Sequence, residues 1–241
     1  MEYAKQTQFI SSIRLNRYEQ ACNGKSARAI GLYQANIFLS QSFYPLLALF
    51  EIAFRNAVDE VLAKYLNDPS WLQSQAMGPH FSSRQGGNAL NKVPAFIARN
   101  RVQKTIRKIL REGKPLTHSR IVSGSTLGFW TELFDKRHYR ILKGQVIQVF
   151  PYRPKGIKRN HIYDRLTQIR LLRNRIAHHE PICFFPGSSQ IDLQNAQLTS
   201  QAMLDLPKWM DQDLNTWGQC IDQVTPELKK LQSEFVFKHV S

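Results

Sequence analysis

IYDRLTQIRLLRNRIAHHEP, residues 162–181, is the segment of the chain that is most informative about the fold. At about 100° per residue, Arg170, Asn174 and His178 repeat along one side of a helix. Pro181 disfavours the helical conformation at the residue before it, so the helix should end near His178 or the histidine after it. We therefore predict an amphipathic helix with polar side chains at its carboxyl end. Its apolar positions fall within an arc of about 80° on roughly the opposite side: Ile162, Ile169, Leu172 and Ile176.

Almost every other apolar stretch also has helical spacing, and no alternating strand pair is joined by a hairpin turn. The sequence therefore predicts an all-α fold, a helical bundle with additional C-terminal helices. Residues 67–90 and 151–158, rich in Pro and Gly, are expected to be loops. The expected helices span residues 8–22, 27–39, 42–66, 94–112, 127–134, 138–150, 161–178, 189–204, 208–224 and 226–236.

Length and composition restrict the class of protein. The chain has 241 residues, of which 42% are hydrophobic and 21% charged, as in a globular protein with one large domain. Its longest apolar stretch, Phe43 to Phe54, is short for a membrane span and contains Glu51. The N-terminus lacks the charged-then-apolar order of a secretory signal. Three distant cysteines fit reduced thiols. We expect a soluble, cytoplasmic protein with no membrane partner.

Positive charge is concentrated in one segment. The chain carries 33 Lys and Arg against 18 Asp and Glu, a net charge of +15. Residues 99–160 hold 16 of the basic residues and only three acidic ones. After Pro181 the balance turns mildly acidic, with four Lys against seven acidic residues. Such a balance favours a polyanionic partner, and RNA is the partner we expect.

Within this basic segment, cations recur at helical spacing beside an apolar stripe, which predicts an amphipathic helix with one cationic face. A second group of cations lies in the loop before residue 160. The alternative is a solvated charged face without a ligand. The predicted RNA-binding residues are Arg101, Lys104, Arg107, Lys108, Arg111, Lys155, Lys158 and Arg159.

The end of the helix in the opening stretch combines groups suited to phosphodiester chemistry. Arg173 can hold two phosphate oxygens and stabilise transition-state charge, Asn174 can orient the phosphate, and the His178 imidazole can move a proton. No carboxylate cluster for Mg²⁺ accompanies them, so we expect a metal-free reaction without a cofactor. The alternatives are that these side chains merely cap the helix, or that both histidines and Cys183 bind zinc, for which no fourth ligand is evident.

Three motifs in order give a family resemblance. RNRIAH, residues 173–178, resembles the R-x4-6-H signature of the HEPN superfamily, and RNRIAHHEPI resembles the motif of its Abi-like (AbiD/AbiF) abortive-infection family. FYPLLALFEIAFRNA, residues 43–57, resembles that family's Glu-containing helix. LGFWTELF, residues 127–134, resembles its middle motif. The resemblance covers most of residues 25–185.

The resemblance implies a HEPN-type helical domain over residues 1–188, with the basic segment within it, and a C-terminal extension, residues 189–241, packed on the same domain. It further implies a metal-independent endoribonuclease of antiphage defence or a toxin of a toxin-antitoxin system. Arg173, Asn174 and His178 match the catalytic motif. The resemblance also suggests Glu51, Arg55 and His179 as support for the active site.

Other roles stay open for the supporting residues and for the whole chain. Glu51 and Arg55 can instead form a buried intrahelical ion pair, and His179 can be a helix cap. The protein can also be a non-catalytic RNA-binding HEPN protein, held in complex with a small RNA or an antitoxin. Because acid and base must act on one phosphate, we expect a homodimer that pairs two motifs.

Overall fold

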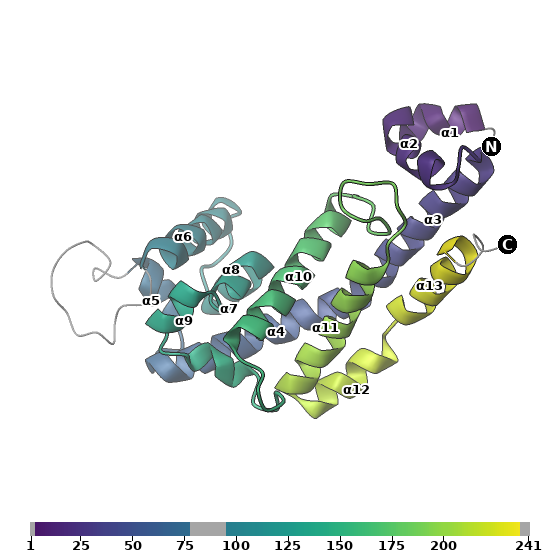
Figure 1. Cartoon of the computed structure of the whole chain (residues 1–241). Coiled ribbons are helices and arrows are strands. Elements are labelled where there is room, and N and C mark those ends of the chain that lie inside the picture. The colour runs from purple at the N-terminus through teal and green to yellow at the C-terminus, as the bar shows by residue number, and fades with distance from the viewer. Residues whose placement is uncertain (1–2, 78–94, 237–241) are drawn as a thin grey trace. The chain divides into compact units, whose positions relative to one another are not determined.

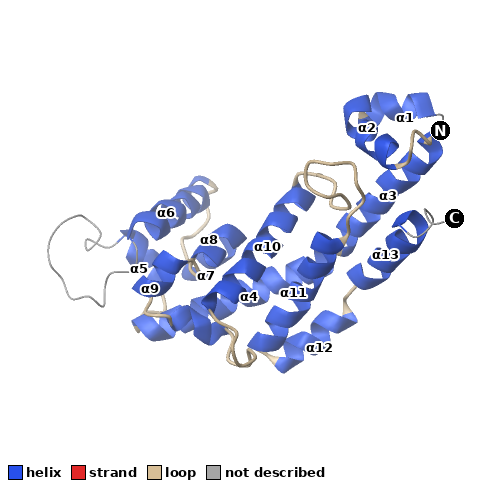
Figure 2. Cartoon of the chain, viewed as in Figure 1, coloured by secondary structure: helices blue, strands red, loops and turns tan. Residues whose placement is uncertain are grey.

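A computed structural model describes residues 3–77 and 95–236 of the chain (Figure 1). Within those residues the structure is helical and contains no β-sheet (Figure 2). A single antiparallel bridge joins Phe184 to Ile191 in the loop after the predicted 161–178 helix. The predicted all-α fold is confirmed.

The described helices are joined by connections of different lengths, the longest within the described residues being residues 178–193. Only the C-terminal helical segment ends in a π-helical turn, and one connection is a 3-10 helix. They are α1 (Tyr3–Ile10), α2 (Ser12–Ala21), α3 (Ser26–Ser42), α4 (Tyr44–Leu66), α5 (Trp71–Met77), α6 (Ala95–Arg111), α7 (His118–Gly124), α8 (Leu127–Glu132), α9 (Lys136–Ile141), η3 (Gln145–Val149), α10 (Arg159–Ala177), α11 (Gln194–Met210), α12 (Gln212–Cys220), α13 (Val224–Leu231) and η4 (Gln232–Val236).

Two predicted helices are divided in the structure. The predicted 8–22 helix is two helices, because Ser11 has a φ of 76° and its Oγ accepts a hydrogen bond from the Arg14 amide, as an N-cap. The predicted 138–150 helix ends at Ile141, because Lys143 and Gly144 take left-handed conformations before η3 begins. The two continuous helices were wrong predictions, and local backbone geometry causes both breaks.

Three further differences come from tertiary packing. The structure contains α5 inside the predicted 67–90 loop, and it contains α7, which the sequence did not predict. Residues 78–90 of that loop lie outside the described residues. The predicted boundary between the 189–204 and 208–224 helices was also wrong, because α11 continues through Pro207 to Met210 and a separate helix, α12, spans Gln212–Cys220. Leu206 and Trp209 on either side of the proline are buried, so packing holds the helix together there.

The chain forms two compact units. Unit 1 consists of residues 1–48, 171–204 and 216–241, and unit 2 of residues 49–170 and 205–215. Both units take segments from each side of the predicted boundary at residue 188. The predicted C-terminal extension contributes to both units. The proposal of a HEPN domain over residues 1–188 therefore stays a prediction.

In unit 1, α2 and α3 hold the loop that follows α10. The Tyr18 ring lies edge-on to Tyr33 and Phe184, with centroids 5.3 and 5.0 Å apart. Arg17 donates hydrogen bonds to the carbonyls of Phe185 and Ser188. The loop that carries the end of the motif is therefore fixed to α2.

In unit 2, α4 is the central helix. Phe54 on α4 packs with Phe134 and Phe150, at centroid distances of 5.7 and 6.2 Å. One turn further along, Asp59 Oδ1 accepts a hydrogen bond from Trp71 Nε1 at 2.7 Å and is 2.9 Å from His118 Nε2. This carboxylate ties α5 and α7 to α4, which explains why two such short helices are stable.

One segment, residues 26–66, is long and apolar enough to cross a membrane by length and composition alone. It comprises α3 and α4. Core helices of soluble proteins also pass this test. The α4 part carries a row of buried side chains at every third or fourth position, which is the pattern of a core helix: Leu46, Phe50, Phe54, Val58 and Leu62.

Candidate active site

Helix α10 ends at Ala177, as Pro181 predicts. His179 takes the left-handed conformation, with a φ of 56°. Its amide donates to the Ile176 carbonyl at 3.0 Å, and the Glu180 amide donates to the Arg175 carbonyl at 2.8 Å. This pair of hydrogen bonds is the standard way to stop a helix, although glycine usually occupies the left-handed position. The histidine pair therefore sits at a well-defined helix end.

Arg175 stabilises the turn that follows. Its guanidinium donates to the Pro181 carbonyl and lies 3.7 Å from a Glu180 carboxylate oxygen. The Ile182 amide then donates to the buried Oδ1 of Asn36 on α3, at 2.8 Å. These contacts give Arg175 and Asn36 structural roles that the sequence analysis missed.

The predicted catalytic residues occupy the end of α10. Arg173 and His178 are exposed, and Asn174 is half-buried. The opposite side is buried, as the spacing predicts: Ile162, Leu166, Ile169, Leu172 and Ile176 have little or no exposed area. The helix therefore packs with its apolar side and leaves a cation, an amide and an imidazole accessible to a ligand.

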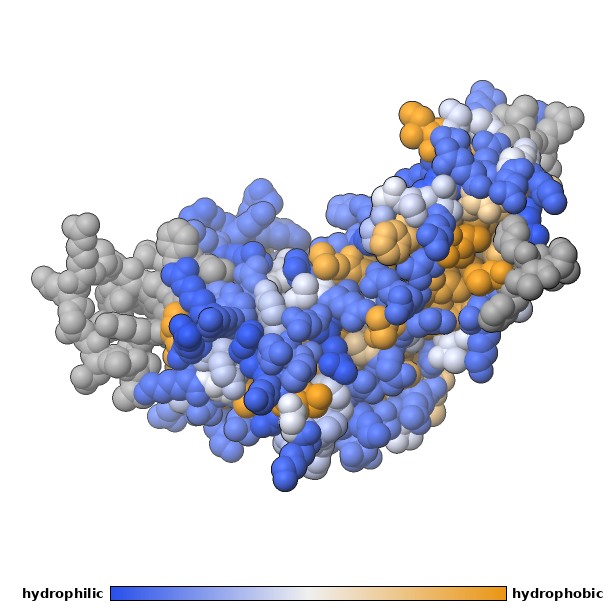
Figure 3. All heavy atoms as spheres, in the orientation of Figure 1, coloured by the Kyte–Doolittle hydropathy of each residue, from blue (hydrophilic) through white to orange (hydrophobic). Residues whose placement is uncertain are grey.

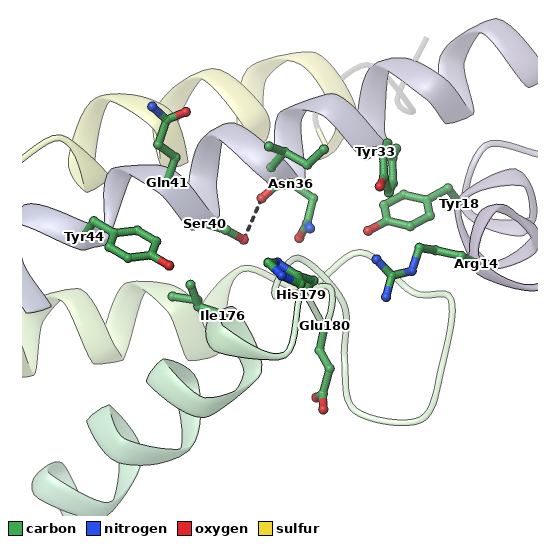
Figure 4. Close-up of a pocket in the computed structure, with 11 residues that line it drawn as sticks. Arg14, Tyr18, Tyr33, Asn36, Ser40, Gln41, Tyr44, Ile176, His179 and Glu180 are labelled. Carbon is green, nitrogen blue, oxygen red and sulfur yellow. Dashed lines mark hydrogen bonds between the residues drawn. The ribbon is translucent and has the colours of Figure 1, made fainter. Parts of the chain in front are cut away.

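A pocket of about 290 Å³ opens beside this helix end (Figure 4). Figure 4 shows His179 between Tyr44 on one side and Tyr18 and Tyr33 on the other. His179 lines the pocket, whereas His178 does not belong to its lining. All lining residues belong to unit 1: Arg14, Tyr18, Tyr33, Asn36, Ile37, Ser40, Gln41, Tyr44, Ile176, His179 and Glu180.

Two ionisable groups near the pocket are kept neutral by burial. Burial raises the pKa of the Tyr18 hydroxyl well above its usual value, and the neighbouring Cys183 contributes in the same direction. Burial also raises the pKa of the Cys183 thiol to about 12. Tyr18 can therefore form hydrogen bonds but not act as a base at neutral pH.

Unit 2 contains a second cavity, of about 610 Å³, which we call the basic groove. It lies between α6 and the connection from α7 to α8. Five of the eight predicted RNA-binding cations line it, which the sequence could not show. The lining consists of Arg101, Lys104, Thr105, Arg107, Lys108, Arg111, Gly124, Ser125, Thr126 and Phe129. Figure 3 shows one face of the molecule coloured by hydropathy, with hydrophilic residues over much of its surface.

One cation of the groove is neutralised. Arg101 Nη2 lies 2.7 Å from Glu132 Oε1. The other carboxylate oxygen, Glu132 Oε2, is buried and has no hydrogen-bond partner among the described residues. In the part of the chain that the structure describes, no ion pair involves the remaining four cations of the groove. These four are Lys104, Arg107, Lys108 and Arg111.

The other predicted site residues lie elsewhere in unit 2. Arg55 donates to the Ser123 carbonyl at 3.4 Å, so it connects α4 to α7, and Glu51 is half-buried one turn earlier. Their role beside the α10 motif stays a prediction. Lys155 and Lys158 are exposed in the loop before α10. Arg159 donates to the Phe134 carbonyl at 2.9 Å, which gives its guanidinium a structural partner.

Comparison with known proteins identifies no relative of the chain. Neither protein-family models, nor curated protein sequences, nor solved structures match it significantly. Within the described residues, no group of three or more His, Cys, Asp or Glu side chains is placed to hold a metal ion. The two cavities and the end of α10 are therefore the features that bear on function.

Proposed function

We propose that the protein is a metal-independent endoribonuclease that cleaves RNA by attack of the 2′-hydroxyl group. The observation that carries this proposal is the end of α10. There an exposed guanidinium, Arg173, precedes two adjacent exposed imidazoles, His178 and His179, on a helix end fixed by its own hydrogen bonds. These are the groups that a phosphodiester reaction needs when no metal takes part.

The reaction has a defined course. One imidazole removes the proton from the 2′-oxygen, which attacks the phosphorus atom and forms a 2′,3′-cyclic phosphate. The bond from phosphorus to the 5′-oxygen breaks, and a second imidazole, protonated, donates its proton to that leaving oxygen. Arg173 stabilises the extra negative charge on the phosphate oxygens. The second imidazole belongs either to the neighbouring histidine of the same chain or to a histidine of the same motif in the partner subunit of a homodimer.

The basic groove supports RNA as the substrate. Four cations that have no ion-pair partner in the described part of the chain line a single cavity, and a polyanion relieves their mutual repulsion. Contacts of this kind bind the phosphate backbone without reading the base sequence. We propose that the groove holds the RNA chain while the reaction takes place at α10.

The biological setting follows from the resemblance alone. The Abi-like motifs favour antiphage defence by abortive infection, or a toxin whose antitoxin is a protein or small RNA. The second candidate function is a non-catalytic RNA-binding protein, which the basic groove favours as much as it favours the enzyme. Cleavage assays must therefore separate the two candidates.

The test uses the purified chain, mixed RNA and the variant Arg173→Ala. We expect wild-type protein to cleave RNA and Arg173→Ala to lose cleavage while it still binds. Arg137→Ala, which removes an exposed arginine of α9, is the matched control and should cleave normally. Equal cleavage by wild type and Arg173→Ala would contradict the assignment. If the wild type and both variants bind RNA and none of them cleaves it, the second candidate is favoured.

A further inference from the structure

The pocket of unit 1 has a size that limits its occupant. Its volume of about 290 Å³ lies at the lower end of the range of about 300–1,000 Å³ found for small-molecule sites. It can hold one ring system but not a helix or a folded segment of a partner. Its charged lining residues are a single cation, Arg14, and a single carboxylate, Glu180. The pocket is therefore not a phosphate site.

Its walls offer both flat and hydrogen-bonding surfaces. Tyr44, at the start of α4, is 59% exposed, so its ring can stack on a ligand. Tyr33 is held edge-on by Tyr18, which makes its position rigid. Aromatic rings of this kind are the usual platforms for unstacked nucleobases.

Polar groups from α3 also line the pocket, and Figure 4 shows Asn36 and Ser40 between Tyr44 and the pair Tyr18 and Tyr33. The Asn36 side chain is oriented by the hydrogen bond that its Oδ1 accepts from the Ile182 amide. The Ser40 hydroxyl donates to the Asn36 carbonyl at 2.8 Å, so its oxygen remains an acceptor. Gln41 is exposed and can donate and accept. Such a mixture fits the edge of a base, which carries both donors and acceptors.

The pocket adjoins the proposed reaction centre. His179 belongs to the lining of the pocket, and Arg173 precedes His179 by six residues, less than two helical turns, at the same helix end. We propose that this pocket is a subsite for one unstacked nucleobase of RNA, with Tyr44 as the stacking platform, Gln41 and Asn36 at the base edge and His179 beside the adjoining phosphate. The inference rests on the proposed function, because it names the substrate group that this site recognises.

The experiment measures binding of a non-cleavable RNA. The probe is a short single-stranded oligonucleotide with 2′-O-methyl groups throughout, which lacks the attacking hydroxyl. A series of probes carries one abasic position each, and fluorescence anisotropy gives the dissociation constants. Tyr44→Leu removes the platform, and Tyr44→Phe keeps it. Trp217→Leu is the control, since Trp217 on α12 is an aromatic residue that is 60% exposed but does not line the pocket.

We expect Tyr44→Leu to weaken binding by about fivefold to a hundredfold, as loss of one base–aromatic stack does. Tyr44→Phe should bind as wild type does, and Trp217→Leu within about twofold. One abasic position should weaken binding to wild type by a similar factor and have no further effect on Tyr44→Leu, because both changes remove the same stacking interaction.

Two results would overturn the subsite. One is that Tyr44→Leu binds all probes as tightly as wild type. The other is that the abasic penalty persists unchanged in Tyr44→Leu, which would place the base elsewhere. These outcomes are separate from failure of the proposed function. If the expected binding pattern is found but unmodified RNA stays intact, the pocket stands and the nuclease proposal fails.

Discussion

The two units carry different chemistry. Unit 1 has 10 basic and seven acidic residues, and its pocket combines one imidazole with phenol and amide groups. Unit 2 has 23 basic and 11 acidic residues, and its groove is lined by five cations without an acidic residue. Under the proposed function, we expect unit 1 to provide the reacting and base-recognising groups, and unit 2 to provide affinity for the phosphate backbone. Variants in one unit should then change one property and leave the other.

The greatest change should come from the histidines of unit 1. His178→Ala and His179→Gly should each lower the single-turnover cleavage rate by about 10²–10⁴-fold, because each removes an acid or base. Glycine at position 179 keeps the helix end, since the residue is left-handed there. The dissociation constant for RNA should change little. An unchanged rate in one variant would assign both proton transfers to the other histidine, and unchanged rates in both would contradict the proposed reaction.

The next effect concerns the basic groove. Replacing Lys104, Arg107, Lys108 and Arg111 by Gln should weaken RNA binding and flatten its dependence on salt by about 0.7 for each phosphate that the variant no longer neutralises. Cleavage at saturating RNA should survive. Arg101 is kept, because its removal would leave the half-buried Glu132 carboxylate without its ion-pair partner.

The matched control for the groove replaces four cations of the same unit outside it. These are Lys136, Arg137, Arg140 and Lys143. Binding titrations at several salt concentrations should separate the two variants. If the control flattens the salt dependence more than the groove variant does, the RNA track lies around α9 and the loop before α10.

A smaller effect is expected from Asn36 on stability. Asn36→Ala leaves the buried Ile182 amide without an acceptor, so unfolding free energy should fall by about 1–3 kcal/mol. Asn16→Ala, which changes an exposed asparagine of α2, should stay close to wild type. Urea denaturation measures both. An unchanged stability of Asn36→Ala would mean that the loop after α10 is held by Arg17 and Arg175 alone.

The smallest effect is a difference in thiol reactivity. Burial raises the pKa of Cys183 to about 12 and also raises the pKa of Cys22, so little reactive thiolate forms at mildly alkaline pH. Cys220 is exposed. Iodoacetamide should therefore add one label to the native protein, at Cys220, as mass spectrometry of peptides would show. Labelling of Cys183 at a similar rate would indicate that the loop after α10 opens.

The sequence predicted best what depends on neighbouring residues. The end of α10 was predictable because Pro181 acts on the residue before it, and the buried stripe was predictable from helical spacing. The short helices α5 and α7 were not predictable, because they depend on hydrogen bonds to Asp59 on α4, which is distant along the chain. Tertiary contacts of single side chains leave no periodic signal.

The two cavities show the same limit. The cations of the groove were predictable from their spacing, but the close approach of Gly124 to Thr105 in its lining, where an added Cβ would be 2.9 Å from Cγ2, was not. The pocket was missed because its rings come from α2, α3 and α4 while its histidine follows α10. Tyr33 and Gln41 belong to no motif, Tyr44 stands at the start of the 43–57 motif, and only the fold brings the three to His179.

The main proposal is that RNA is cleaved at the end of α10 without a metal ion. The sharpest measurement is an analysis of the cleavage products formed by the wild-type protein in EDTA. We predict cleavage with 2′,3′-cyclic phosphate or 3′-phosphate ends, and no cleavage of DNA or of RNA with a 2′-O-methyl group at the scissile position. Cleavage that requires Mg²⁺ and leaves 5′-phosphate ends would contradict the proposal.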